Sequence, residues 1–330
     1  MLNHIEKGEC VRTPKVLSIQ SHVVHGYVGN KAATFPLQYK GWDVDVLNTV
    51  QLSNHPGYGK FTGHKAKASD VYDILKKGLL GDLNMTYDAI LTGYIPCTDT
   101  LKLLSQTLGD ACKKDHRLKW IVDPVLGDNG KLYVSDKNVP VYKCILRENR
   151  LFMVTPNQFE METLTGMGIT SLESLRQGFI KFHNLYPLVE RVVITSMEIT
   201  ISDDNTDYLV CACCDFVAKP DAVHYFKVPK LNAHFSGSGD LFTALLLDCL
   251  LHPTAKQPLD LSHTVSAVLS LVDDILLRTM DLTLSKGDFL TNKPSVINDL
   301  KLVNCLDLLA QPPGSHTTTR FRPTSIELFR

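Results

Sequence analysis

The stretch His234-Phe-Ser-Gly-Ser-Gly-Asp-Leu-Phe-Thr-Ala-Leu-Leu-Leu247 joins a glycine-rich turn to a strongly apolar helical pattern. Glycines let the backbone turn sharply, and the first amides of the helix that follows have no partner inside it. With the positive end of the helix dipole behind them, these amides predict an anion site. Asp240 at its mouth would repel a bound phosphate, which favours a general base beside a transferring phosphoryl group. An ordinary capped helix start explains the same residues equally well.

Outward from this turn, short β-rich runs alternate with longer amphipathic runs, which predicts a mostly parallel sheet with helices on both faces. The runs of strand character are Lys15–Gln20, Trp42–Asn48, Ala89–Thr92, Trp120–Asp123, Phe152–Thr155 and Arg191–Thr195. The helical patterns are Lys31–Tyr39, Asp70–Lys77, Thr98–Lys114, Gln158–Leu164, Leu172–Leu185, Ser238–Leu251 and Leu261–Arg278. Two further runs, Tyr208–Phe216 and Ala222–Val228, are expected to pair antiparallel at the sheet edge.

No Pro/Gly/Ser-rich linker divides the sequence, so we expect one domain over residues 1–330. Residues 1–14 and 311–330 have no periodic pattern and are expected to be irregular tails, the second one ending in a short strand or helix. The formal net charge of −1 indicates no nucleic-acid partner. No apolar run reaches the roughly 20 residues that cross a membrane, and the polar N-terminus lacks a signal core.

Nine cysteines without regular spacing indicate free thiols in a reducing compartment, so the cytosol is the expected location. The segment Cys211-Ala-Cys213-Cys214 contains a formal C-x-x-C pattern. It lies in an apolar run of strand character, where residues three apart point to opposite faces. Buried strand thiols are therefore a better interpretation of this segment than a metal or redox site.

Other phosphate and nucleotide motifs are absent from the sequence. It contains no G-x-x-x-x-G-K-[ST] loop, no complete G-x-G-x-x-G after a first strand and no His-Arg-Asp catalytic loop. P-loop proteins, dinucleotide-binding dehydrogenases and protein kinases are thereby disfavoured.

Small or polar residues follow six of the predicted strands, and ligands of an open parallel sheet bind beyond the carboxyl ends of its strands. These residues are Ser21-His22, Asn48, Gly93-Tyr94, Asp123-Pro-Val-Leu-Gly-Asp128, Thr155-Pro-Asn157 and Thr195-Ser196. The carboxylates Asp123 and Asp128 suit Mg²⁺ beside phosphate oxygens, although a solvated turn explains them too. Asn157 and the first-turn acid Glu160 are expected to face the same edge.

Two glycine-punctuated loops carry hydroxyl, imidazole and aromatic groups but no carboxylate. They are Ser21-His-Val-Val-His-Gly26-Tyr-Val-Gly29-Asn30 and Asn54-His55-Pro56-Gly57-Tyr58-Gly59. Such loops suit a neutral, planar, hydrogen-bonding substrate better than a cation. Each histidine fits a structural role in a turn as well.

Together these residues resemble the pyridoxal kinases of the ribokinase-like superfamily. The resemblance is carried by Ser18-Ile-Gln-Ser-His-Val-Val-His-Gly-Tyr-Val-Gly-Asn-Lys-Ala-Ala-Thr-Phe-Pro-Leu-Gln38, Ser53-Asn-His, Leu91-Thr-Gly-Tyr94, Asp123–Asp128, Tyr133-Val, Thr155–Glu160, Val193-Ile-Thr-Ser196 and Gly237-Ser-Gly-Asp-Leu-Phe242. The first block is specific to pyridoxal kinases, whereas the last one indicates only a ribokinase-like protein. The resemblance fades beyond Leu251.

The resemblance implies a three-layer α/β/α fold and ATP-dependent phosphorylation of the 5′-hydroxymethyl group of pyridoxal, pyridoxine or pyridoxamine, as in vitamin B6 salvage. It implies Asp240 as base and an anion hole of Gly237, Ser238 and Gly239. The implied substrate positions are Ser21, Val28, His55, Pro56, Tyr94, Tyr133 and Asp240. The implied ATP positions are Asp128, Thr155, Asn157, Thr195, Ser196, Gly237 and Ser238. The implied Mg²⁺ positions are Asp123, Asp128 and Glu160, with a monovalent cation such as K⁺ nearby. A cytosolic homodimer is implied as well.

The sequence departs from the family pattern at three places. Pro56 stands where the family usually has Thr, which removes a hydroxyl and an amide donor from the substrate loop. Ser238 replaces the commoner Thr and keeps the oxygen. The lid segment Asn129-Gly-Lys-Leu-Tyr133 is shorter than in animal relatives. Two other functions fit the same residues, a hydroxymethylpyrimidine kinase and a non-catalytic binder of pyridoxal phosphate.

Overall fold

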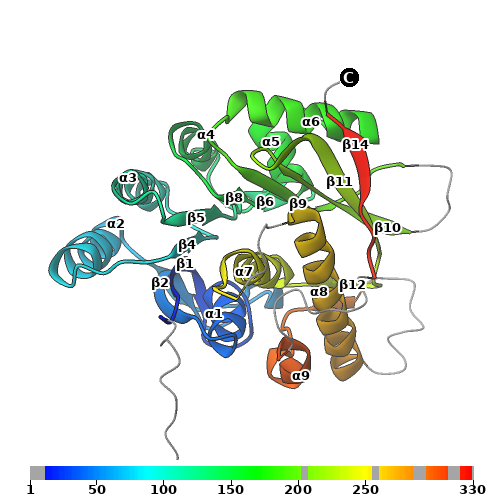
Figure 1. The fold of residues 1–330 in the computed structure, drawn as a ribbon. Helices are drawn as coiled ribbons and strands as arrows, with labels where there is room; N and C mark the ends of the chain where they lie inside the picture. Colours follow the sequence, from blue (N-terminus) through cyan, green and yellow to red (C-terminus); the bar gives the residue numbers. More distant parts are fainter. Residues whose placement is uncertain (1–11, 202–206, 255–259, 285–294, 311–319, 329–330) are drawn as a thin grey trace, which may run out of the picture.

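A central ten-stranded sheet organises the part of the chain that the computed structural model describes, residues 12–201, 207–254, 260–284, 295–310 and 320–328 (Figure 1). Its strand order is β14-β11-β10-β9-β8-β5-β4-β1-β2-β3. The strands from β2 to β9 in this order are parallel: β2 (Asp43–Leu52), β1 (Lys15–Val23), β4 (Ala89–Thr92), β5 (Lys119–Val122), β8 (Met153–Val154) and β9 (Arg191–Met197). The predicted mostly parallel sheet is confirmed.

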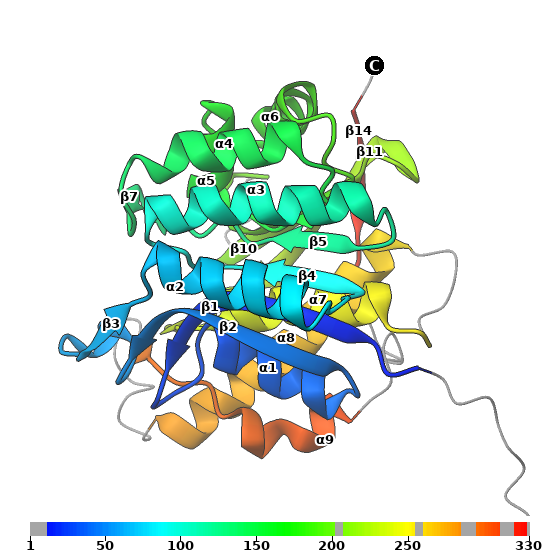
Figure 2. The same ribbon diagram turned by 90° about the vertical axis from the view of Figure 1, so that its left-hand side faces the viewer.

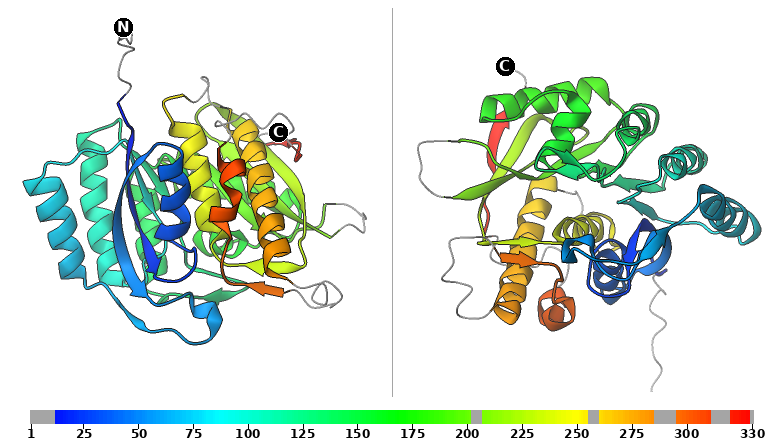
Figure 3. Two further views of the ribbon diagram at one scale, coloured as in Figure 1. Left: turned by 90° about the horizontal axis from the view of Figure 1, so that it is seen from below. Right: turned by 180° about the vertical axis from the view of Figure 1, so that it is seen from behind.

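Helices cover both faces of the sheet and make the three-layer arrangement expected from the sequence (Figure 1). One face packs against α2 (Ala68–Tyr72), its π-helical continuation η2 (Asp73–Asp82), α3 (Thr98–Lys114), α4 (Asn138–Glu148), α5 (Gln158–Thr165) and α6 (Leu172–Leu185). Figure 2 shows α2, α3 and α4 in front of the sheet. The other face packs against α1 (Asn30–Tyr39), α7 (Ser238–Leu251), α8 (Leu261–Thr283) and α9 (Leu306–Leu309), seen together in Figure 3.

The two apolar cores follow from alternation along the strands. Leu17 and Ile19 of β1 belong to the core under α2–α6, whereas Val16 belongs to the core under α1, α7 and α8. The helix α7 is apolar nearly all round because it lies between α1 and α8 and against the sheet. Its N-terminus, the glycine-rich turn, is thereby fixed against the strands that carry the predicted site.

The two runs predicted to pair antiparallel do so. β10 (Tyr208–Asp215) pairs antiparallel with β9 and with β11 (Lys219–Pro229). Cys211 and Cys213 lie in the core under α7 and α8, and Cys214 lies in the opposite core, all three fully buried. The interpretation of this cluster as buried strand thiols is confirmed, because alternation sends Cys211 and Cys214 to opposite faces.

Several elements were not anticipated. Helix α4 (Asn138–Glu148) follows the lid segment, and two short hairpin strands, β6 (Gly127–Asp128) and β7 (Lys131–Leu132), bring its two ends together. β3 (Gly63–Lys65) pairs antiparallel with β2. A parallel pair, β12 (Ala233–Phe235) and β13 (Ser295–Ile297), leads into the glycine-rich turn.

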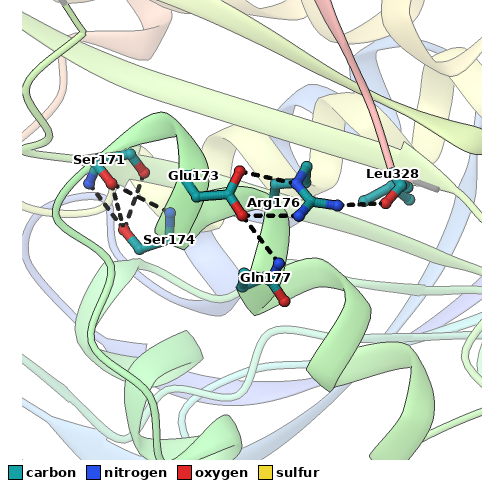
Figure 4. A network of polar contacts seen from close by, with 6 residues as sticks. All are labelled: Ser171, Glu173, Ser174, Arg176, Gln177 and Leu328. Carbon is teal, nitrogen blue, oxygen red and sulfur yellow. Dashed lines mark hydrogen bonds and ion pairs between the residues drawn. The ribbon is translucent and has the colours of Figure 1, made fainter. Parts of the chain in front are cut away.

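The tail expected to be irregular over 311–330 contains the outermost strand of the sheet, β14 (Thr324–Glu327), which pairs antiparallel with β11. The observed strand agrees with a short element near the end of this tail. Figure 4 shows how α6 holds it: Arg176 Nη1 donates to the Leu328 carbonyl oxygen at 2.7 Å. Its guanidinium is oriented by Glu173, whose carboxylate accepts from Nε and Nη2. The predicted tail 1–14 lies mostly outside the described residues.

None of the helices among the described residues has the length and apolar character needed to cross a membrane.

Candidate active site

The glycine-rich turn opens α7 in the way its sequence predicts. Gly237 is the N-cap residue with φ 84°, and a Cβ at this position would overlap the Tyr27 carbonyl oxygen. Ser238 Oγ donates to the Phe235 carbonyl oxygen at 3.3 Å, so it braces the turn. Among the described residues no side chain caps this helix, and Gly239 faces open space. Its first amides therefore remain free to bind an anion.

Asp240 lies half-buried in the first turn of α7, beside the loop that follows β1. Its Oδ2 accepts a hydrogen bond from the Gly29 amide at 2.7 Å. Burial raises the pKa of Asp240 to about 6, partly offset by this hydrogen bond, which favours the ionised form. A carboxylate with such a pKa is ionised at neutral pH yet basic enough to accept a proton.

The first glycine-punctuated loop brings two predicted substrate positions, Ser21 and Val28, close to the residue that donates to this carboxylate. Gly29 has φ 53°, and a Cβ there would overlap the Oγ and carbonyl oxygen of Ser21. Val28, buried at 6% exposure, directly precedes it. Glycine is thus needed both for the backbone conformation and for the close approach of Ser21.

A buried polar network lies under that loop. Asn30 Nδ2 donates to the Gln20 and Leu47 carbonyl oxygens and to Asn48 Oδ1, and Asn30 Oδ1 accepts from Ser18 Oγ at 2.8 Å. β2 is bulged opposite this point, since the register with β1 shifts after Gln20. The network fixes the start of α1, and therefore Gly29, relative to β1 and β2.

The second glycine-punctuated loop forms a single 3₁₀ turn, Pro56–Tyr58, capped by His55. His55 Nδ1 accepts from the Gly57 amide at 3.1 Å and lies 3.2 Å from Ser236 Oγ, one residue before Gly237. Burial lowers the pKa of His55, so its neutral form is favoured, with the proton on Nε2. Pro56 occupies the first position of the turn, where no amide donor is required.

Tyr94 is half-buried just beyond β4, and its carbonyl oxygen accepts from Thr49 Oγ1 at 2.7 Å at the β2 bulge. Burial raises the pKa of its phenol. Tyr133 follows the lid hairpin and is 58% exposed. The hairpin turns at Asn129 and Gly130, with φ 50° and 73°, as a type I′ turn requires. Partial burial of the phenol raises the pKa of Tyr133, and the nearby acids Asp128 and Glu160 add to this shift.

The predicted acidic positions differ in how their oxygens are used. Glu160 is 3% exposed and forms a capping box with Asn157: its Oε2 accepts from the Asn157 amide at 2.9 Å. Its Oε1 accepts from the Leu126 amide at 2.9 Å and the Gly127 amide at 3.4 Å. Burial raises the pKa of Glu160, and these hydrogen bonds oppose that shift. Glu160 thus anchors the lid segment to α5.

Asp123 is 8% exposed, and no described residue donates a hydrogen bond to its carboxylate. Burial and the neighbouring Glu160 and Asp240 raise the pKa of Asp123 well above its ordinary value. An unpaired buried carboxylate among other acids fits a cation bound together with phosphate oxygens. The described residues hold no group of three acid, His or Cys side chains arranged for a metal.

Four of the predicted nucleotide positions, Thr155, Asn157, Thr195 and Ser196, lie just beyond β8 or near the end of β9. Thr155 is 1% exposed, and its hydroxyl is 3.0 Å from Thr243 Oγ1 on α7. Asn157 caps α5 and donates from Nδ2 to the Gly127 carbonyl oxygen at 2.8 Å. The Thr195 amide donates to the Pro156 carbonyl oxygen at 3.0 Å, which leaves the half-buried Thr195 and Ser196 side chains beside this loop.

Sequence reasoning missed several residues that shape the site. Gly29 and Asn30 are interpreted from the sequence only as parts of a loop. A glycine directly before an Asn that begins a helix is the pattern that would have identified them. Asn298 and Asp299 follow the short apolar strand β13, in the same strand-then-polar pattern as the other positions. This pattern alone does not tell that β13 lies beside the substrate loops.

The fold and site are those of an α/β phosphotransferase, and comparisons with known proteins agree. Residues 69–255 match the family model described as phosphomethylpyrimidine kinase. A putative pyridoxal kinase of Saccharomyces cerevisiae, BUD17, is 50% identical over 299 residues, which cover 91% of this chain and 93% of that protein. The pyridoxal kinase of Arabidopsis thaliana is 40% identical over 274 residues, covering 82% and 83%.

Solved structures are similar over nearly the whole chain. Pyridoxal kinase from Leishmania donovani in complex with ADP and pyridoxamine has a TM-score of 0.75 at 30% identity, covering 94% of this chain and 99% of that one. Plasmodium falciparum PdxK with AMP-PNP and PL has a TM-score of 0.77 at 25% identity, covering 95% and 99%. The chain belongs to the pyridoxal kinase family and has its ribokinase-like fold.

Proposed function

We propose that this protein transfers the γ-phosphate of ATP to the 5′-hydroxymethyl group of pyridoxal, and of pyridoxine and pyridoxamine, in vitamin B6 salvage. The observation that carries the proposal is the Asp240 carboxylate, held by the Gly29 amide at 2.7 Å beside the free amides that open α7. A base and an anion hole are thereby adjacent. Relatives named pyridoxal kinase, and neighbours bound to ADP with B6 vitamers, support this substrate class.

In this mechanism Asp240 accepts the proton of the substrate hydroxyl as the alcohol oxygen attacks the γ-phosphorus of ATP, whose bond to the bridging oxygen breaks and releases ADP. The amides of Ser238 and Gly239 stabilise negative charge on the transferred phosphoryl group. The two substrate loops, with Ser21, Val28, His55 and Tyr94, hold the pyridine ring. Tyr133 and the lid hairpin exclude water, which would otherwise accept the phosphate.

Asp123 and Asp128 would hold Mg²⁺ beside the nucleotide phosphates, with Glu160 orienting the loop between them. Mg²⁺ neutralises charge on the β- and γ-phosphates when it is bound. Thr155, Asn157, Thr195 and Ser196 would line the nucleotide side, with K⁺ as monovalent cation. We propose as well that the chain forms one domain and acts as a cytosolic homodimer.

The decisive experiment is an ATP-consumption assay with pyridoxal, Mg²⁺ and K⁺, run beside the same assay with hydroxymethylpyrimidine. The matching family model makes this second alcohol the relevant rival. We expect turnover of pyridoxal to exceed that of hydroxymethylpyrimidine at least tenfold in kcat/KM. The reverse order would replace the proposal by a hydroxymethylpyrimidine kinase, and pyridoxal binding without ATP turnover would replace it by a non-catalytic binder.

The Asp240→Asn variant tests the base directly. Removing a general base costs about two or more orders of magnitude in rate. We therefore expect kcat to fall at least 100-fold while the circular dichroism spectrum and nucleotide binding are retained. Near-normal turnover of this variant would exclude Asp240 as the base.

A further inference from the structure

The residues Ser295–Asp299, which we call the C-terminal strap, lie between the substrate loops and the segment that leads into the anion-hole turn. Its strand β13 runs parallel to β12, with Ile297 opposite Phe235. The Ser236 amide donates to the Ile297 carbonyl oxygen at 3.0 Å, one residue before Gly237. The strap is outside the range that matches the family model, yet it is attached to the start of the catalytic turn.

The side chain of Asp299 bridges the two substrate loops. Its carboxylate accepts a hydrogen bond from the Tyr58 hydroxyl of the second loop and lies 3.3 Å from His25 Nε2 of the first. The rings of His25 and Tyr58 meet edge to face, with centroids 6.1 Å apart. Asp299 is 12% exposed, and a Cβ on Gly26 would overlap its carboxylate. One carboxylate thus contacts both loops.

Asn298 adds a second contact with the same loop pair. A Cβ on Gly57 would come within 2.5 Å of Asn298 Oδ1, so the backbone of the 3₁₀ turn lies directly against this side chain. The neighbouring His55 has its Nδ1 close to Ser236 Oγ. The second loop is therefore held from both the strap and the catalytic turn.

Apolar burial does little to hold the tip of the first loop, Val24-His25, although Val23 and Val28 on either side of it are buried. Val24 is 63% exposed and the His25 side chain 71% exposed. A cavity of about 250 Å³ borders the loop and the residues after the strap, lined by Tyr27, Lys31 and Lys301 among others. Segments with so few buried apolar contacts are fixed mainly by their hydrogen bonds and ion pairs. Contacts with Asp299 therefore matter for where this loop lies.

The position of the first loop sets two features of the site. Three residues after Gly26 the same loop supplies the Gly29 amide, the donor to Asp240. Between them, the Tyr27 carbonyl oxygen packs against Gly237 so closely that only glycine fits. A displacement of the loop would therefore move a substrate wall and loosen the orientation of the base.

We propose that Asp299 is a positioning residue of this enzyme: by bridging His25 and Tyr58 it holds the two substrate loops in the geometry that binds the alcohol substrate. This inference rests on the proposed function and deepens it. It predicts a selective effect, because the strap contacts the substrate loops and Ser236, the residue before the turn, but none of the nucleotide positions near β8 and β9. The alcohol substrate should lose affinity while ATP does not.

The test is a double-mutant cycle of Asp299→Asn and Tyr58→Phe, with KM and kcat measured for pyridoxal and for ATP. We expect each single change to raise the KM for pyridoxal about tenfold, which is about 1.4 kcal/mol, with the KM for ATP within twofold of the wild type. The double variant should resemble Asp299→Asn alone, because Tyr58→Phe removes only one of the two contacts that Asp299→Asn weakens. Asp299→Glu, which keeps the carboxylate, should recover part of the loss.

Asp307→Asn is the matched control, since Asp307 also follows the strap but pairs with Arg278 of α8. We expect its KM values to equal those of the wild type. An additive double variant, or equal increases in both KM values for Asp299→Asn, would overturn the inference. If Asp299→Asn does not fold, the Tyr58→Phe variant, at an exposed side chain, tests the inference by itself through the same comparison of the KM values for pyridoxal and ATP.

A readout independent of turnover separates this inference from the proposed function. If the wild type does not phosphorylate pyridoxal, the proposed function fails. Amide hydrogen exchange in 24–29 and 53–59 then still tests the bridge: Asp299→Asn should speed exchange there at least fivefold, relative to Asp307→Asn. Unchanged exchange in both loops would show that Asp299 does not position them.

Discussion

The chemistry proposed for this protein depends on one carboxylate whose environment balances two opposed effects. Burial makes the ionised form of Asp240 less favourable, and the Gly29 amide makes it more favourable. Since the resulting pKa is about 6, we expect kcat/KM for pyridoxal to fall about tenfold per pH unit below pH 6. A pH–rate profile between pH 5 and pH 8 measures this. A flat profile would show that no group of this pKa limits the reaction.

The same pKa shift makes a prediction about stability. A carboxyl whose pKa is higher in the folded than in the unfolded chain stabilises the fold at low pH, and this contribution is lost as pH rises through the folded pKa of about 6. At pH 8 the fold therefore carries the cost of a partly desolvated charge. We expect Asp240→Asn to raise the melting temperature at pH 8, and the difference from the wild type to shrink below pH 4. A lower melting temperature at pH 8 would contradict the raised pKa.

Pro56 allows a second prediction at the residue scale. It begins the 3₁₀ turn of the second substrate loop and fixes φ there, but it lacks the hydroxyl and amide donor of the Thr usual in the family. Pro56→Thr should lower the KM for pyridoxal about threefold, because one added hydrogen bond contributes about 1 kcal/mol and part of it is offset by lost rigidity. Steady-state kinetics with pyridoxal and with ATP measure both KM values. Equal changes in the two would show that Pro56 does not act through the substrate loop.

At the scale of single elements, the sequence predicts most of the fold. α3, α6 and α7 begin and end where the periodicity places them, and the six parallel strands lie where the apolar runs indicate. Helix α4 escaped because Pro140 lies in its first turn, where proline is tolerated although its presence suggests a break. β14 agrees with the short strand or helix expected near the end of the tail, but its pairing could not be predicted, because its partner β11 lies about a hundred residues earlier in the sequence.

The candidate site also has residues that the sequence predicts and contacts that it does not. Asp240, Asp123 and the strand ends are local patterns, so they are visible in the sequence. The Gly29–Asp240 hydrogen bond and the Asp299 bridge join residues more than 200 positions apart, and no local pattern records such contacts. The role of Glu160 shows a different limit. An acid in the first turn of a helix suits a metal, a dipole or a capping box, and only its hydrogen bonds distinguish these.

Glu160 is the basis of a prediction for α5 and the lid hairpin. Its two oxygens accept from three backbone amides, of Asn157, Leu126 and Gly127. Glu160→Gln offers a single acceptor oxygen and places an amide donor against backbone N–H groups, so we expect a loss of about 1–3 kcal/mol in the free energy of unfolding. Urea denaturation measures the loss. Glu162→Gln is the comparison variant. Its Oε1 accepts a hydrogen bond from a single backbone amide, that of Ile169, so we expect a smaller loss in the free energy of unfolding. An unchanged midpoint for Glu160→Gln would contradict a structural role.

At the scale of the whole molecule, the C-terminal residues close the sheet at the edge far from the site. Phe321, 5% exposed, packs against α8, where Ser266 Oγ donates to its carbonyl oxygen, and Leu328, 1% exposed, lies in the core beside α6. Between them β14 pairs with β11 and covers the hydrogen-bonding groups of a strand that would otherwise be a sheet edge. Arg176 secures the end of this segment through the Leu328 carbonyl oxygen (Figure 4).

Shortening the chain to residue 319 should therefore destabilise the fold without changing the chemistry. Removing two buried side chains costs at least about 3 kcal/mol in the free energy of unfolding, and the uncovered β11 should promote association of the shortened chains. Two strands, β10 and β11, separate β14 from β9, which carries Thr195 and Ser196, so kcat of the remaining folded protein should stay within twofold. Urea denaturation measures the free energy of unfolding, light scattering the association, and active-site-normalised kinetics the kcat.

Arg176→Gln is the control, because it removes one hydrogen bond and leaves the strand in place. It should lose only about 1 kcal/mol in the free energy of unfolding and remain unassociated. A shortened chain as stable as the wild type would show that β14 is not needed to close the sheet, and a loss of kcat would show that this edge and the site are coupled.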